Sequence, residues 1–466
     1  MTQCNVIDLS HSHSLALNYW REALGKLATV AISSMPPWAL NLMDARGSDS
    51  RAAQRFQMMS EQAIEGFVPL RRRLGLPLLV LYGTGITVGA GIYVLIGAVA
   101  GHAGVFAPWS FVLAAVVMGL TVASYAELST RYPVSAGEAA YVRAAFRSPA
   151  FSTAVGLLTV AIGVIASATV TLGSAGYIQQ FVDLPQSLIV TAVLVILGGV
   201  ACLGILESVV LASVFTVIEV GGLVIIVVAA AHADLPIVTT TAHMPPLNAA
   251  GLSGIAFGSL LAFFAFIGFE DLANVVEEAK VPHRDIPRAM ILTLLISTLL
   301  YIVVAAVAVS AVSIERLSSS PAPLSLVFRE VAGVSPATIS AIAIVATLNT
   351  ILAQMTMASR VIYGVARERQ LPAVLARVNP RTGTPLVATV LIVVMVVPLA
   401  LFVPLASLAE GTSLATLGVF SLVNLSLLRL RYRGVQSETP HVTVPVFVPA
   451  AGFATCIAMM AIAFLK

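Results

Sequence analysis

Residues 83–93 read "GTGITVGAGIY" and lie inside an apolar run that extends from Leu76 to Ala100. A run of this length is typical of a helix that crosses a membrane. Each glycine inside a helix nevertheless weakens it by about 0.5–1 kcal/mol. A broken helix is tolerated at membrane depth only where the break lines a cavity or a ligand site. The stretch therefore predicts either a ligand site or close packing of a second helix against Gly85 and Gly89.

The composition of the chain decides its class. Of its 466 residues, 58% are hydrophobic and only 10% are charged, and the mean hydropathy is +0.97. Soluble domains carry about 25% charged residues. The apolar segments are unbroken and about 20 residues long, which favours helices over the alternating strands of a barrel. The composition therefore predicts an all-α polytopic membrane protein.

Windows of about 19 residues predict about eleven spans. They lie near residues 76–100, 107–128, 150–178, 187–206, 208–231, 251–277, 287–312, 338–364, 385–404, 407–429 and 443–465.

Basic residues gather in alternate loops, and the positive-inside rule places those loops in the cytoplasm. The opposite loops carry Arg316 and Arg329, and Lys466 ends the chain. The N-terminus is therefore predicted to be cytoplasmic in a multi-pass protein of the cell membrane. The residues that decide this orientation are Arg71, Arg72, Arg73, Arg131, Arg143, Arg147, Lys280, Arg284, Arg288, Arg360, Arg367, Arg369, Arg377, Arg381, Arg429, Arg431 and Arg433.

A second interruption lies in span six, where residues 260–280 read "LLAFFAFIGFEDLANVVEEAK". Gly268 is followed by Glu270 and Asp271, and two acids at this depth would cost several kcal/mol in a continuous helix that faces lipid. Counted along the chain, spans one and six are the first members of two successive sets of five spans. Interrupted helices at corresponding positions of two halves point to a secondary transporter with inverted repeats and a midplane site. This second break favours the ligand site over simple packing.

Three stretches resemble one transporter family. "GTGITVGAGIYVLIGAVAGHAG" and "SYAELSTRYPVSAGEAAYV" are similar to the first three spans of permeases in the amino acid–polyamine–organocation superfamily. "FFAFIGFEDLANVVEEAKVPHRDIPRAMI" resembles span six of its cationic-amino-acid-transporter-like branch, and "ASRVIYGVARERQLP" resembles the end of span eight. The resemblance covers about Arg71 to Pro372.

The resemblance implies a LeuT-like 5+5 inverted repeat with broken spans one and six. Residues 71–430 would form the ten-helix transport core, and residues 431–466 would add one further span. Members of the superfamily usually have twelve spans, one more than we predict here. Residues 1–70 are predicted to form a cytoplasmic tail, either disordered or upstream of the true start of the protein.

The resemblance also implies the substrate site. The amides of Gly89, Ala90 and Gly91 would bind the substrate carboxylate at the positive N-terminus of a half-helix. The rings of Phe264 or Phe266 could cover the site. The α-ammonium would lie against the carbonyls of Ile86, Phe263, Phe264, Ala265, Phe266 and Ile267, where another half-helix ends with unpaired acceptors.

The acids of span six leave two interpretations open. Asp271, with Glu270, could bind a cationic substrate side chain, or both could cap the second half of the helix near its N-terminus. Span three carries small residues such as Ala166 and Ala168 and no charge at its centre. This favours neutral over cationic amino acids.

Glu219 lies near the middle of span five, 208–231. An ionisable group at that depth costs about 2.5–3.5 kcal/mol on insertion scales, which makes it a candidate for function. In proton-coupled relatives the matching position, counted from Glu207, carries a lysine. Here a carboxyl could carry the coupled proton and bond to span one or to span eight near Thr356 or Ser359. Alternatively it coordinates sodium, or stays protonated and only joins helices.

These features predict a proton-coupled amino acid importer that uses alternating access and needs no cofactor. Its partners would be a small amino acid, a proton or alternatively a sodium ion, and the lipid bilayer, but no nucleic acid. A sodium symporter, an exchanger and a non-transporting nutrient sensor are the alternatives. A membrane-embedded enzyme is disfavoured because neither metal-ligand spacing nor a nucleophile–base pair occurs in the spans, and the three cysteines form no framework.

Overall fold

The structure is a computed structural model that describes residues 72, 74–133, 137–203, 209–233, 235, 249–367, 369–435, 437 and 440–464. Arg71–Lys466 form one compact unit. The predicted N-terminal tail, 1–70, lies outside the described residues.

Each predicted span overlaps at least one helix of the structure. The helices are α4 (Leu76–Ala103), α5 (Ala107–Arg131), α7 (Pro149–Ile178), α8 (Gln186–Leu203), α9 (Val209–His232), α11 (Ala249–Ala265) with α12 (Asp271–Asn274), α13 (Pro282–Ala311), α16 (Ala337–Arg367), α17 (Leu386–Phe402), α18 (Leu405–Tyr432) and α19 (Phe447–Ala463). Shorter elements connect them: η1 (Gly104–Phe106), α6 (Gly137–Phe146), η2 (Val276–Glu278), α14 (Ile314–Ser319), α15 (Pro323–Ala332) and η3 (Ala373–Ala376).

Within the described residues, seven helical segments are long and apolar enough to cross a membrane. One of them, Leu76–Arg131, contains both α4 and α5, and α11, α17 and α19 provide shorter apolar helices. Large apolar side chains lie exposed on the outer helices: Leu299 is 65% exposed, Ile196 63% and Val394 61%. Such surfaces are favourable in lipid rather than in water. The protein is therefore an all-helical, multi-pass membrane protein.

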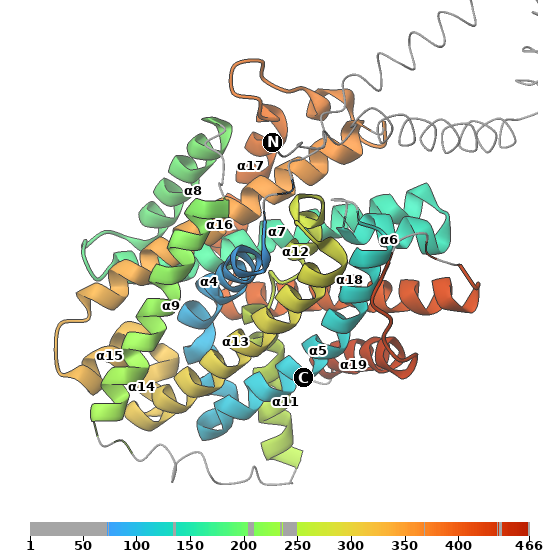
Figure 1. The fold of residues 1–466 in the computed structure, drawn as a ribbon. Coiled ribbons are helices and arrows are strands. Elements are labelled where there is room, and N and C mark those ends of the chain that lie inside the picture. Colours follow the sequence, from blue (N-terminus) through green and yellow to red (C-terminus); the bar gives the residue numbers. More distant parts are fainter. Residues whose placement is uncertain are drawn as a thin grey trace, which may run out of the picture. The chain divides into compact units, whose positions relative to one another are not determined.

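Helix α4 is enclosed by its neighbours, which Figure 1 shows around it. It packs against α9, α11 and α13, while α7 and α16 pack along one another. Close approach depends on small residues: a β-carbon at Gly85 would collide with the side chain of Thr216 on α9. At Gly85 the alternative of close helix packing is therefore confirmed.

Two contacts join distant segments at the end of the bundle where α4 begins. The Leu74 amide donates to the carbonyl of Glu278 across 3.0 Å, and the Lys280 amide donates to the carbonyl of Leu74 across 2.9 Å. Leu74 and Ala279 thus form a parallel bridge.

The second contact centres on the fully buried Glu127, at the end of α5. Its carboxylate lies 3.0 Å from Arg131 Nε, as the spacing of the two residues predicts. Arg431 Nε of α18 donates to the same carboxylate across 3.1 Å, and the Val444 amide donates across 2.9 Å. This Glu127 ion-pair cluster fixes the ends of α5 and α18 and the loop before α19.

Candidate functional site

The predicted break in the first span occurs at Gly89. Its backbone angles, φ −14° and ψ −121°, are not helical, whereas α4 is helical before and after it. Gly89 lies against α16, because a β-carbon there would meet Thr350 Oγ1 at 2.6 Å. The second half of α4 begins here, so its first amides and the positive end of its dipole face the protein interior.

The predicted break in span six separates α11, which ends at Ala265, from α12, which begins at Asp271. Gly268 has φ +128°, a conformation that other residues rarely adopt. A β-carbon at Gly268 would lie 3.0 Å from the carbonyl oxygen of Ile86. One at Gly91 would lie 2.9 Å from Ala265 Cβ and closer still to its backbone. The two interrupted segments therefore touch each other.

A small cavity adjoins this crossing and measures about 20 Å³. Its walls come from both breaks and from the paired helices α7 and α16. The lining residues are Ile86, Thr87, Ala90, Gly91, Ala166, Val170, Phe264, Ile267, Thr350 and Gln354. Five predicted site residues, Ile86, Ala90, Gly91, Phe264 and Ile267, are thus brought together, and Gly89 adjoins Thr350 beside them.

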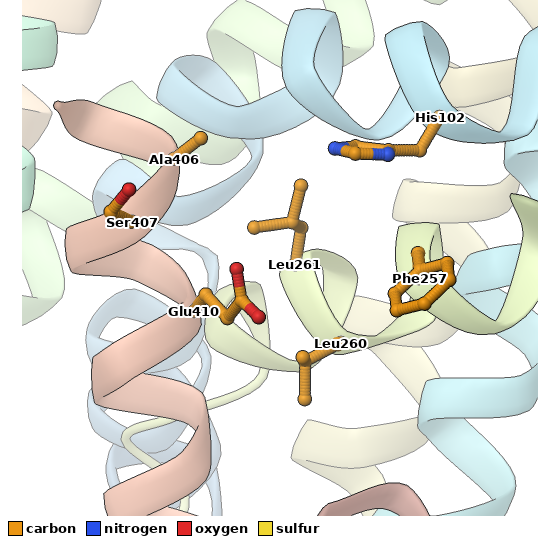
Figure 2. A pocket seen from close by; sticks show the side chains of 7 residues that line it. All are labelled: His102, Phe257, Leu260, Leu261, Ala406, Ser407 and Glu410. Carbon is orange, nitrogen blue, oxygen red and sulfur yellow. The ribbon is translucent and has the colours of Figure 1, made fainter. Parts of the chain in front are cut away.

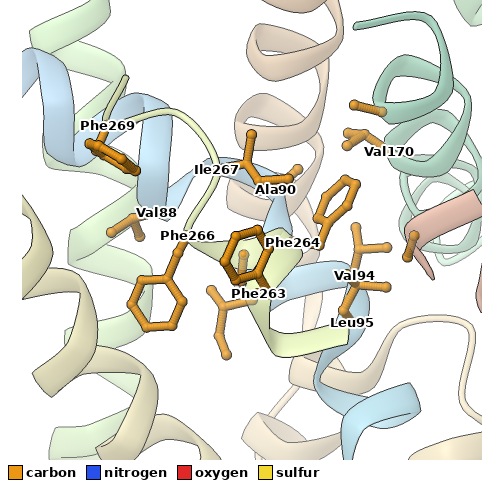
Figure 3. Close-up of a cluster of buried hydrophobic side chains, with 14 of the residues drawn as sticks. Val88, Ala90, Val94, Leu95, Val170, Phe263, Phe264, Phe266, Ile267 and Phe269 are labelled. Atoms are coloured by element: carbon orange, nitrogen blue, oxygen red, sulfur yellow. The ribbon is translucent and has the colours of Figure 1, made fainter. Parts of the chain in front are cut away.

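The rings of Phe264 and Phe266, both in span six, lie in different surroundings. Phe264 lines the cavity, and Figure 3 shows it on the side of Val170, with Phe266 pointing elsewhere. Phe266 packs against Tyr301 with ring centroids 4.9 Å apart. Of the two candidate rings, Phe264 is therefore the one placed to cover a ligand.

Several carbonyls predicted to receive an ammonium group already have donors. The Tyr301 hydroxyl lies 2.7 Å from the carbonyl of Ala265. The carbonyls of Phe263 and Phe264 accept from the amides of Phe266 and Ile267, across 3.0 and 3.2 Å. A carbonyl has two lone pairs, so these groups can accept once more. Tyr301, on α13, was missed by sequence reasoning.

The acids of span six lie beside the cavity rather than in its wall. Glu270 Oε2 accepts the Gly268 amide across 2.8 Å. Asp271 Oδ1 accepts from Asn274 Nδ2 across 3.1 Å and lies in the first turn of α12. Glu270, at the N-cap position of α12, makes no side-chain cap hydrogen bond, and neither acid lines the cavity, so both interpretations stay predictions.

Glu219 of α9 is fully buried. Neither carboxyl oxygen has a hydrogen-bond partner of standard geometry among the described residues. Its backbone carbonyl accepts the Tyr93 hydroxyl of α4 across 2.6 Å. Asn349 of α16 faces the carboxyl. The expected neighbours on span eight were Thr356 or Ser359, but Ser359 Oγ instead donates to the Thr356 carbonyl of its own helix.

A second cavity of about 60 Å³ lies where α4, α11 and α18 meet, near the end of α4 opposite Leu74. Figure 2 shows His102 and Glu410 on opposite sides of it, with Leu261 between them. His102 is exposed at this position. Among the described residues, no cluster of three or more His, Cys, Asp or Glu could hold a metal ion.

Comparison with known proteins gives consistent matches. The model of the family described as amino acid permease matches residues 74–466. The chain is 31% identical over 401 residues to the mitochondrial cationic amino acid transporter 3 of Arabidopsis thaliana, covering 80% of this chain and 64% of that protein. It is 28% identical over 405 residues to the branched-chain amino acid permease BcaP of Bacillus subtilis (strain 168), covering 81% and 84%. The chain thus spans less than two thirds of the plant transporter.

Proposed function

Because this chain belongs to the amino acid permease family, we propose that it is a secondary active transporter that imports amino acids across the cytoplasmic membrane by alternating access. The observation that carries the proposal is the contact between the two breaks, Gly89 in α4 and Gly268 before α12. Two broken membrane helices that touch beside a cavity provide amide donors and carbonyl acceptors at one point.

The zwitterionic ends of an amino acid match these two sets of groups. The carboxylate binds the amides of Gly89, Ala90 and Gly91, where the second half of α4 starts. The ammonium binds carbonyls on the other side of the crossing, from Ile86 and from the segment between Phe263 and Ile267. Asp271, in the first turn of α12, then acts through the dipole of that segment rather than by touching the substrate.

The fold proposed for this activity is the 5+5 inverted repeat, with residues 71–430 as its core and 431–466 as one additional span. Its cytoplasmic face is the end that carries Leu74 and the Glu127 ion-pair cluster. The contacts support the grouping of these loops on one side, because they join only segments that the basic residues place together, and the positive-inside rule assigns that side to the cytoplasm. Arg316, which pairs with Glu330 across 2.6 Å, belongs to the opposite face.

Glu219 is the proposed coupling residue. It is buried beside α4 and α16, two of the helices that line the cavity, and its carboxyl has no partner of standard geometry among the described residues. A carboxyl in this position can bind a proton while the site faces one side and release it on the other. Sodium is the second candidate for the coupling ion. An ionised Glu219 could coordinate it, because the carboxylate oxygens lie beside the side-chain amide of Asn349.

Uptake by purified protein in liposomes tests both the transport of amino acids and its coupling to protons. Labelled amino acids should accumulate when a proton gradient, acidic outside, is imposed, and a sodium gradient alone should give no accumulation. Glu219→Gln keeps the shape of the side chain but does not titrate. It should retain exchange of internal for external substrate and lose accumulation driven by the proton gradient. The exposed Glu315 provides the matched control, Glu315→Gln.

The outcomes separate the candidate functions. Accumulation by Glu219→Gln under a proton gradient alone removes Glu219 as the coupling group. Accumulation that follows only sodium selects the sodium symporter, and exchange without accumulation selects an exchanger. Binding without any movement of substrate selects a sensor.

A further inference from the structure

One polar side chain of the cavity is not explained by recognition of the amino acid backbone. Gln354 of α16 lines the cavity and is only 8% exposed. Its Oε1 has no hydrogen-bond partner among the described residues. Buried polar groups are paired in the great majority of cases, and an exception calls for a functional or structural reason. Thr87 Oγ1, in the same wall, is also buried without a partner within the described chain.

The position of Gln354 relative to the breaks indicates which part of a substrate it would meet. The amides and carbonyls of α4 and span six form one side of the cavity. Ala166 and Val170 of α7, with Thr350 and Gln354 of α16, form the other. A substrate whose carboxylate and ammonium bind the breaks must therefore direct its side chain between α7 and α16. There Gln354 Oε1 has no partner among the described residues, whereas the Thr350 hydroxyl already donates to the Ala346 carbonyl across 3.0 Å.

The walls beside Gln354 are narrow and uncharged. The cavity measures only about 20 Å³. Gly163 lets α7 approach the Gln354 backbone, because a β-carbon there would lie 3.2 Å from the Gln354 carbonyl. None of the lining side chains of the described cavity is charged. A cationic side chain would thus be buried without a counter-charge, which is unfavourable. A hydrocarbon side chain would leave the carboxamide oxygen of Gln354 without a hydrogen-bond donor, which is also unfavourable.

We propose that Gln354 selects substrates with a short, uncharged side chain that donates a hydrogen bond, namely a hydroxyl or a carboxamide. Threonine, serine and asparagine belong to this class. The inference rests on the proposed function, since it assumes that an amino acid binds at the two breaks. It adds a residue that recognises the side chain of the substrate. The main-chain groups of the breaks bind only the carboxylate and the ammonium, which all amino acids share.

Isosteric pairs of amino acids test this selection. Threonine and valine have nearly the same shape and differ by a hydroxyl, and asparagine and leucine differ by a carboxamide. The full-length protein in detergent is titrated with each of the four, with thermal stabilisation as the readout for binding. Wild-type protein should bind threonine about five- to tenfold more tightly than valine, and asparagine more tightly than leucine, as expected for one net hydrogen bond.

Gln354→Met keeps the length of the side chain and removes the amide. It should abolish the preference for threonine, with valine bound at least as tightly as in wild-type protein, which also shows that the variant is folded. Gln180→Met is the matched control, because Gln180 is exposed beyond the end of α7.

Failure of the inference differs from failure of the proposed function. A wild-type protein that binds valine as tightly as threonine, or a Gln354→Met variant with an unchanged threonine-to-valine ratio, overturns the role of Gln354 while amino acid binding stands. The wild-type ratio decides even if the variant does not fold. Absence of stabilisation by any amino acid overturns the proposed function together with this inference.

Discussion

The hydroxyl of Tyr301 lies 2.7 Å from the carbonyl oxygen of Thr87, just before the break in α4. The same hydroxyl lies 2.7 Å from the last carbonyl of α11, at Ala265. Both carbonyls are at points where helical hydrogen bonding is interrupted, and each needs a donor inside the membrane. The two carbonyls share the single hydrogen of this hydroxyl, so one side chain on α13 links both broken helices.

Tyr301→Phe removes this hydroxyl and keeps the ring. We expect a loss of about 1–3 kcal/mol in stability, because two buried carbonyls lose the one donor that they share. A lower melting temperature in detergent and slower uptake in liposomes are the expected results. Tyr432→Phe is the control, because Tyr432 is 94% exposed. Equal melting temperatures for the two variants would show that the carbonyls find other donors.

Gly268→Ala tests the contact between the breaks. Gly268 has φ +128°, and a β-carbon there would meet Ile86. The variant should lose amino acid binding, since the second break must move away from the first. Gly364→Ala is the matched control, because a β-carbon at this helical glycine meets nothing within 4 Å. Binding by Gly268→Ala with wild-type affinity would contradict the proposed site.

Glu127→Gln tests the Glu127 ion-pair cluster. The carboxylate is fully buried, and the side chains of Arg131 and Arg431 are only 10% and 13% exposed. Removing one member of a buried pair leaves uncompensated charge and costs about 3–5 kcal/mol. Glu330→Gln breaks the more exposed pair with Arg316 and should cost at most about 1 kcal/mol. Comparable melting temperatures for the two variants would contradict the role of the cluster.

Glu138, on α6 between two spans, should make stability depend on pH. Burial raises the pKa of its carboxyl, even though Tyr125 donates a hydrogen bond to it across 2.9 Å. Because the folded pKa is raised, stability is fully present below the unfolded pKa of about 4.3 and is lost as pH rises through the folded pKa. Glu138→Gln should therefore melt at an increasingly higher temperature than wild-type protein as pH rises. Glu315→Gln should follow wild-type protein, and an unchanged Glu138→Gln difference across pH would contradict this assignment.

The predicted orientation is tested by labelling with a reagent that does not cross the membrane. In a background without native cysteines, Arg316→Cys should react in intact cells, and Arg377→Cys should react only after permeabilisation. Both positions are exposed in the structure. The reverse pattern would place the N-terminus outside.

The sequence predicts the positions of the helices and of both breaks well. Glycines and acids interrupt apolar runs, and such interruptions are visible in a single chain, as at Gly89 and Gly268. The 5+5 relation of the spans stays a prediction, because it concerns symmetry between the halves rather than local pattern. The same holds for proton coupling at Glu219.

The sequence does not predict which side chains enter the cavity. In a soluble helix the polar face reveals the orientation, but a membrane helix is apolar toward both lipid and protein. The sequence thus cannot separate Phe264, in the cavity wall, from Phe266, against Tyr301. Which residue faces the Glu219 carboxyl depends on how α9 and α16 cross. The sequence suggests Thr356 or Ser359, whereas Asn349 faces the carboxyl in the structure. The sequence analysis does not single out Gln354, although an amide within an apolar span is a signal that could have found it.

The bridge between Leu74 and Ala279 constrains how the site can open. Leu74 immediately precedes the first half of α4, and Ala279 follows η2, which continues from α12. Two backbone hydrogen bonds fasten these segments together. The first half of α4 therefore cannot swing outward by itself unless both bonds break. With the bonds intact, we expect the first half of α4 to move together with α12 and η2, so that an opening on this side would form around this joined segment rather than within it.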